Sequence, residues 1–227
     1  MAHQYGNPPW AVAPAPGLSI VDRVFLLTHD TNSGKAQIAL DLIGVGLAGA
    51  ALLELTMSSS VTVKHSTEIV RVTQYQHHDE AAQYVLTRIY ESEPTLYATS
   101  DWITVLRNEL YLGVAGTLVK RGLIDEHRSS LRGARYIPRR RDAAEESLAW
   151  VYGLLQSPRR AADAGERAVL LACLAGALGV AATITALPAS EIASSLPTLV
   201  GRCNVQDALI VKEVQRAATK LAVTPRR

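Results

Sequence analysis

The chain has 227 residues, of which 48% are hydrophobic and 19% charged, so it can bury the core of one domain. Its formal net charge of +2 excludes binding to nucleic acid through bulk positive charge alone. The two cysteines exclude a disulfide framework and cannot by themselves complete a structural zinc site. Aromatic residues are few, and the abundance of alanine and leucine favours closely packed helices.

The amino-terminal segment contains neither the basic nor the apolar region of a secretory signal peptide. Prolines recur in it instead, which is typical of an extended arm. We therefore expect a disordered arm over residues 1–18 and a single domain over residues 19–227, located in the cytoplasm.

In chain order, a short apolar segment at residues 19–28 and a turn at residues 29–34 precede the first long apolar helix. Alternating valines beyond it predict a β-hairpin around Ser66, and Gly133 predicts the turn of a second hairpin. Asp79 is placed to cap the helix between them. This order predicts a mainly α single domain with one or two small β-hairpins. We expect helices at residues 35–57, 79–91, 101–121, 142–156, 164–186, 189–199 and 204–223, and hairpins at residues 61–72 and 128–138.

Residues 168–188 form an uncharged stretch that is long enough to span a bilayer. The stretch consists largely of alanine, glycine and threonine, which contribute little free energy of transfer into lipid. We therefore expect a buried core helix rather than a transmembrane one.

Positive charge is concentrated in residues 120–141, where eight basic residues stand against two acidic ones, a local charge of +6. Such a segment is either a solvated arginine-rich loop or a surface that contacts phosphate groups. Each basic residue near an anionic bilayer contributes about 1 kcal/mol. Because no nucleic-acid-reading motif accompanies the charge, we expect an anionic phospholipid surface as the partner and no nucleic acid.

Three patterns that resemble catalytic or binding motifs have simpler structural interpretations. The G-x-G-x-x-G pattern at residues 44–49 lies inside an apolar helix, where its small residues favour close helix packing over dinucleotide binding. His77 and His78 are adjacent and point in different directions on a helix, so they do not chelate a metal together. Cys173 lies among alanine and leucine, where a thiol acts as a small apolar group. We expect no metal and no cofactor.

The order of several segments resembles that of the Golgi phosphoprotein 3 family, in particular its bacterial, actinomycete-type members. The resemblance covers about residues 19–223. The segments that carry it are GLAGAALLEL (residues 46–55), HHDEAAQYVLTRI (77–89), GTLVKRGLI (116–124), ARYIPRRR (134–141) and AVLLACLAGALG (168–179).

The resemblance implies a bundle of central buried helices surrounded by amphipathic helices, with a projecting second hairpin. Members of this family are peripheral membrane proteins that bind phosphatidylinositol 4-phosphate, and in eukaryotes they are adaptors for glycosyltransferases. The resemblance therefore implies a cytoplasmic lipid-binding adaptor at the membrane, rather than an enzyme, that self-associates through the hairpin at residues 128–141.

The resemblance also locates a family headgroup pocket, built from one tryptophan and three arginines. This chain has Ala39, Ala48, Asn108 and Tyr111 at those positions, and none of these side chains can bind phosphate in a bidentate manner. We therefore expect binding to an anionic surface through arginines rather than through the family pocket. The expected lipid or anion contacts are Arg107, Arg132, Arg135, Arg139, Arg140 and Arg141.

Two carboxylates lie in the first long apolar helix. Asp41 and Glu54 are about 220° apart around a helix, which argues against a catalytic pair. Glu54, near the end of the helix, is placed to bond to a loop or an arginine. The alternative function is a bacterial small-molecule-binding protein or enzyme with an apolar helical pocket near Asp41, Ala48 and Glu54. In it the two carboxylates are the weak catalytic candidates, and the pKa of one is raised.

Overall fold

The structure is a computed structural model that describes residues 17–64, 68–71, 76–92, 97–129 and 133–223. Most of the expected arm, residues 1–18, therefore lies outside the described residues. The helices are α1 (Ile20–Leu27), α2 (Leu40–Met57), α3 (Glu80–Glu91), α4 (Thr99–Leu106), α5 (Leu110–Lys120), α6 (Arg141–Gln156), the 3-10 helix η2 (Pro158–Ala162), α7 (Glu166–Ala177), α8 (Val180–Thr185), α9 (Ala189–Val200) and α10 (Val205–Val223). The strands are β1 (Val61–Lys64), β2 (Glu68–Arg71), β3 (Ile124–Ser129) and β4 (Gly133–Pro138).

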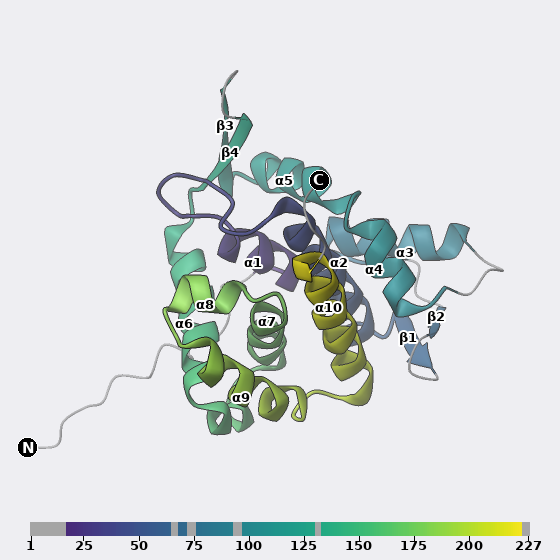
Figure 1. Cartoon of the computed structure of the whole chain (residues 1–227). Coiled ribbons are helices and arrows are strands. Elements are labelled where there is room, and N and C mark those ends of the chain that lie inside the picture. Colours follow the sequence, from purple (N-terminus) through teal and green to yellow (C-terminus); the bar gives the residue numbers. More distant parts are fainter. Residues whose placement is uncertain (1–16, 65–67, 72–75, 93–96, 130–132, 224–227) are drawn as a thin grey trace, which may run out of the picture.

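Two apolar helices, α2 and α7, form the centre of the core, and amphipathic helices surround them (Figure 1). Glycines in α2 allow close approach of its neighbours. A Cβ atom at Gly49 would lie 2.3 Å from Cγ2 of Val214 on α10, and one at Gly46 would lie 2.5 Å from Cδ1 of Leu178. The interpretation of the glycine pattern as a packing surface is therefore confirmed, and the mainly α fold class is confirmed with it.

Three of the expected helices are shorter than the sequence indicates. The first long helix begins at Leu40 instead of residue 35, because Ala36 pairs with His29 in a β-bridge and the backbone of Gln37 bonds to the carbonyl of Thr28. The segment at residues 101–121 is divided between α4 and α5. The segment at residues 164–186 is interrupted at Gly179, whose φ of 74° separates α7 from α8.

Both expected hairpins are present as antiparallel pairs. In the second, the register runs from Ile124 opposite Pro138 to Ser129 opposite Gly133, so the hairpin is longer than the expected residues 128–138. Gly133 has a φ of 72°, as a turn glycine requires. This hairpin projects from the helical body (Figure 1).

The uncharged segment at residues 168–188 is not a membrane span. Its first part belongs to α7, whose residues Leu171, Cys173 and Leu174 have no exposed surface. Within the described part of the chain, one helix is long and apolar enough to cross a bilayer, namely α2, and 72% of it is buried inside the protein. A core helix of this kind has the same composition as a membrane span.

Candidate functional site

A basic groove of about 1100 Å³ runs between α4 and α10. Four cationic side chains and one carboxylate line it, which gives a local charge of +3, and Arg216 is ion-paired with Glu213. We call this feature the α4–α10 groove. Its lining residues are Ser100, Thr104, Arg107, Lys212, Glu213, Gln215, Arg216, Ala217, Thr219, Lys220 and Val223.

The spacing of charges on α10 explains why they share one wall of the groove. Lys212, Arg216 and Lys220 are four residues apart, so they lie on one face of the helix. The opposite face is buried against the core through residues such as Val211 and Val214. Sequence reasoning missed this stripe, although its four-residue spacing is a readable signal.

Arg107 forms the other wall of the groove, directly after the end of α4. Its side chain is half-buried, and its buried Nε has no hydrogen-bond partner within the described residues. Because this Nε is buried, an anion in the groove would reach Arg107 through the terminal nitrogens of its guanidinium group. Arg107 is therefore the expected contact residue that the geometry favours most.

Exposed apolar side chains lie at the helix ends that meet around Arg107. The start of α2 meets the end of α4 because Gly44 packs against the Arg107 backbone, and α5 begins three residues after Arg107. At these ends Leu40 is 52% exposed, Leu112 72% and Val223 77%. Val223 also lines the groove itself. A cationic groove bordered by exposed apolar groups is typical of a surface that rests on a membrane interface.

The four positions that the resemblance assigns to a headgroup pocket carry no cationic side chain and lie in different surroundings. Ala48 is fully buried, and Asn108 is exposed. Ala39 is the residue before the first turn of α2. Tyr111 packs in an aromatic cluster, and its hydroxyl lies 3.1 Å from Nε2 of His29. Burial raises the pKa of Tyr111 to about 12, so it stays a neutral phenol.

The arginines of the second hairpin are largely paired with carboxylates of the same segment. Arg128 binds Glu126 at 2.7 Å, and Arg139 binds Asp125 at 2.6 Å. Arg140 binds Asp142 at 2.7 Å. These side chains are exposed, so the ion pairs are weak.

Two other arginines of this segment form no ion pair within the described part of the chain. Arg135 borders a shallow depression together with Lys35, and Arg141 is exposed at the start of α6. Arg132 lies outside the described residues. The sequence charge of +6 already subtracts Asp125 and Glu126, and the pairs of Arg121 with Asp22 and of Arg140 with Asp142 lower it to +4.

Asp41, Ala48 and Glu54 do not line one common pocket in the described part of the chain, and the pocket of about 500 Å³ that Glu54 borders includes neither of the other two. The three residues occupy different environments along α2, because Asp41 is exposed in its first turn and Ala48 is packed in the core. A carboxylate in the first turn interacts favourably with the helix dipole, which accounts for Asp41 without catalysis.

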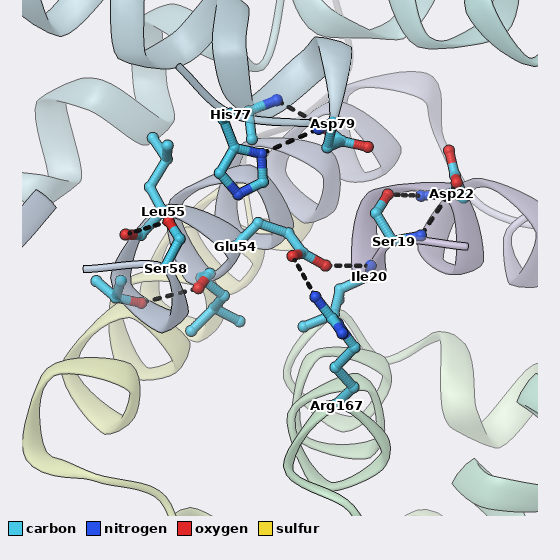
Figure 2. Close-up of polar contacts among 12 residues, drawn as sticks. Ser19, Ile20, Asp22, Glu54, Leu55, Ser58, His77, Asp79 and Arg167 are labelled. Atoms are coloured by element: carbon cyan, nitrogen blue, oxygen red, sulfur yellow. Dashed lines mark hydrogen bonds and ion pairs between the residues drawn. The ribbon is translucent and has the colours of Figure 1, made fainter. Parts of the chain in front are cut away.

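Glu54 is buried and fully paired, as its position near a helix end predicts. Its carboxylate accepts hydrogen bonds from the backbone N–H of Ile20 at 2.7 Å and from Arg167 at 3.1 Å (Figure 2). Figure 2 shows that these partners approach from α1 and α7, and that the His77 ring lies on the other side of the Glu54 side chain. Glu54 thus joins the beginnings of α1 and α7 to the end of α2, which is a structural role.

Metal-binding and dinucleotide motifs have no counterpart in the described structure. Its residues contain no group of three or more histidine, cysteine or acidic side chains placed to hold a metal ion. The G-x-G-x-x-G pattern at residues 44–49 lies inside α2, not at a strand-to-helix turn.

The protein is mainly α-helical, and amphipathic helices surround its buried core helices. It also carries a projecting hairpin and a cationic surface groove. A family model described as Golgi phosphoprotein 3 (GPP34) matches residues 20–221 of the chain. The chain therefore belongs to the Golgi phosphoprotein 3 family, and the resemblance seen in its sequence motifs is confirmed. A comparison with curated proteins gives no match.

Proposed function

We propose that this protein is a peripheral, cytoplasmic adaptor that binds anionic phospholipid through the α4–α10 groove and the exposed apolar residues beside it. The observation that carries the proposal is the position of Arg107. It lines the groove with Lys212, Arg216 and Lys220, and it lies near the ends of three helices that expose apolar side chains.

The two parts of this surface would act on different parts of a lipid. Basic side chains near an anionic bilayer contribute about 1 kcal/mol each, so three to four of them supply about 3–4 kcal/mol, which is millimolar binding on their own. Leu40, Leu112 and Val223 would add to this by leaving water for the interface between headgroups and acyl chains. Because the first contribution is electrostatic, binding should weaken strongly with salt.

The proposal does not rely on phosphatidylinositol 4-phosphate as a specific ligand. Ala39, Ala48, Asn108 and Tyr111 stand where the family uses groups that grip a phosphate, so we propose recognition of surface charge rather than of one headgroup. Self-association through the hairpin at residues 128–141 is a further part of the proposal, supported by the projection of this hairpin from the body (Figure 1).

Vesicle flotation tests the proposal directly. The full chain should float with phosphatidylcholine vesicles that contain phosphatidylserine at low salt, and should not float with phosphatidylcholine alone. Addition of salt to about 1 M, where the Debye length is about 3 Å, should release it. Absence of binding to the anionic vesicles at low salt, or equal binding to both compositions, would refute the proposal.

A further inference from the structure

The two cysteines of the chain are distant in sequence but adjacent in the fold. Cys173 lies in the middle of the buried helix α7, and Cys203 lies in the turn between α9 and α10. Their sulfur atoms are 3.9 Å apart, which is direct contact. No pattern in the sequence indicates this pair, because each cysteine by itself is typical of a small apolar side chain.

The surroundings of the pair would allow the sulfurs to approach to bonding distance. A disulfide needs an S–S distance of about 2.05 Å, so the two atoms must move about 2 Å closer together. Cys173 is held by a rigid helix, but Cys203 belongs to a non-helical turn that can adjust its backbone and side-chain torsion. The required movement therefore falls on the more adaptable residue.

The two thiols also differ in the way that thiol–disulfide exchange requires. Cys203 is half-buried and thus accessible to a small reagent, whereas Cys173 is buried. The hydrogen bond between the two thiols lowers the pKa of Cys203, and burial and the charges of Asp207 and Glu166 oppose this only in part. The same hydrogen bond, together with burial, raises the pKa of Cys173. Cys203 is therefore the attacking thiolate and Cys173 the thiol that resolves the intermediate.

We propose that Cys173 and Cys203 are a redox modification site that forms an intramolecular disulfide by exchange with a low-molecular-weight disulfide such as oxidised glutathione. The Cys203 thiolate attacks one sulfur of the reagent, which forms a mixed disulfide and releases one small thiolate. Cys173 then attacks the Cys203 sulfur and gives its proton to the departing small thiolate, which leaves as the second small thiol. Both cysteines are oxidised, and one reagent disulfide is reduced to two thiols.

The new bond would tie the turn before α10 to α7. The chain between the two cysteines contains α8 and α9, so the bond closes a loop of about 30 residues. A cross-link of this length restricts the unfolded chain and should raise the midpoint of thermal unfolding. This inference does not depend on the lipid-binding proposal.

The test uses the reduced full chain incubated with oxidised glutathione and analysed by intact mass and thiol alkylation. We expect the mass to fall by two hydrogen atoms, both cysteines to resist alkylation, the unfolding midpoint to rise, and dithiothreitol to reverse all three changes. In the Cys173→Ser variant, which lacks the resolving thiol, the glutathione adduct on Cys203 should accumulate instead.

Three outcomes would overturn the inference: two thiols that stay free in the wild-type chain, a stable glutathione adduct on it, or a disulfide between two chains. The measurement on the wild-type chain does not depend on whether the variant folds. The Cys203→Ser variant provides a control, because the buried Cys173 alone should react slowly and form little adduct.

Discussion

Gly44 of α2 lies against the backbone of Arg107, so close that a Cβ atom at position 44 would be 2.0 Å from the Arg107 carbonyl oxygen. This contact is between two backbones and cannot be relieved by rotation of a side chain. It fixes the residue after α4 against α2, and it thereby sets the position from which the Arg107 side chain enters the α4–α10 groove.

The Gly44→Ala substitution should consequently destabilise the protein. Forcing an extra methyl group into a filled site costs about 1–3 kcal/mol, which exceeds the gain of less than about 1 kcal/mol from the better helix propensity of alanine. Urea denaturation would measure the change in the free energy of unfolding. Gly116→Ala in α5 is the matched control, since it has open space around its Cβ position, and it should stabilise the chain by about 0.5–1 kcal/mol. A neutral or stabilising Gly44→Ala would contradict the packing described here.

Glu54→Gln should also destabilise the protein, by about 1–3 kcal/mol. The amide keeps the shape of the side chain but cannot satisfy both the N–H of Ile20 and the guanidinium of Arg167 as a carboxylate does. Arg167→Ala should cost less than about 1 kcal/mol, because the arginine is 45% exposed and its ion pair is screened by water. Chemical denaturation of both variants would measure the free energy of unfolding and should show the larger loss for Glu54→Gln. A larger cost for Arg167→Ala would show that the ion pair, not the bond to Ile20, is the main contribution.

Stability should fall in mildly acidic solution because of His29. Burial lowers the pKa of this histidine in the folded protein, so the unfolded chain binds the proton more tightly. The stability contributed by neutral His29 is therefore complete above its ordinary pKa of 6.5 and is lost as the pH falls below that value.

The check is the urea midpoint at pH 7.5 and at pH 5.5 for the wild type and His29→Gln. The decrease in the urea midpoint from pH 7.5 to pH 5.5 should be smaller in His29→Gln than in the wild type. His127→Gln is a control on the exposed surface of β3, and its urea midpoint should decrease as much as that of the wild type. Equal pH dependence in all three proteins would rule out His29 as the group that titrates.

The nature of the lipid headgroup should matter little once surface charge is matched. Vesicles with phosphatidylinositol 4-phosphate and vesicles with more phosphatidylserine, adjusted to equal surface potential, should bind the protein within about a factor of two of each other. The reason is the absence of phosphate-gripping side chains at Ala39, Ala48, Asn108 and Tyr111. Co-sedimentation isotherms would measure this, and a preference of about tenfold or more for the phosphoinositide would mean that another specific pocket exists.

Much of the fold could be predicted from the sequence because its signals are local. The long apolar run that becomes α2, the cap at Asp79 and the turn at Gly133 depend on neighbouring residues alone. The late start of α2 could not be predicted, because it follows from pairing of Ala36 with His29, which replaces a helical backbone by a β-bridge.

The candidate site was harder to predict because its charge balance depends on tertiary contacts. Counting charges along the chain favoured the hairpin, but it could not show that Arg139 and Arg140 there form exposed ion pairs with Asp125 and Asp142. The groove instead combines Arg107 with residues of α10 about a hundred positions later, and no sequence signal indicates that these two helices pack together. The contact between Cys173 and Cys203 was missed for the same reason.

The most direct test of the central claim compares two variants with the same loss of charge. The groove variant carries Lys212→Gln, Arg216→Gln and Lys220→Gln, and the hairpin variant carries Arg135→Gln, Arg139→Gln and Arg140→Gln. Circular dichroism and the thermal midpoint would establish that both remain folded.

Partition onto phosphatidylserine vesicles at low salt would then be measured for both variants. We predict about 100-fold weaker binding for the groove variant, since it loses three charges of about 1 kcal/mol each, and a much smaller change for the hairpin variant. Loss of binding in the hairpin variant, with binding retained in the groove variant, would contradict the account.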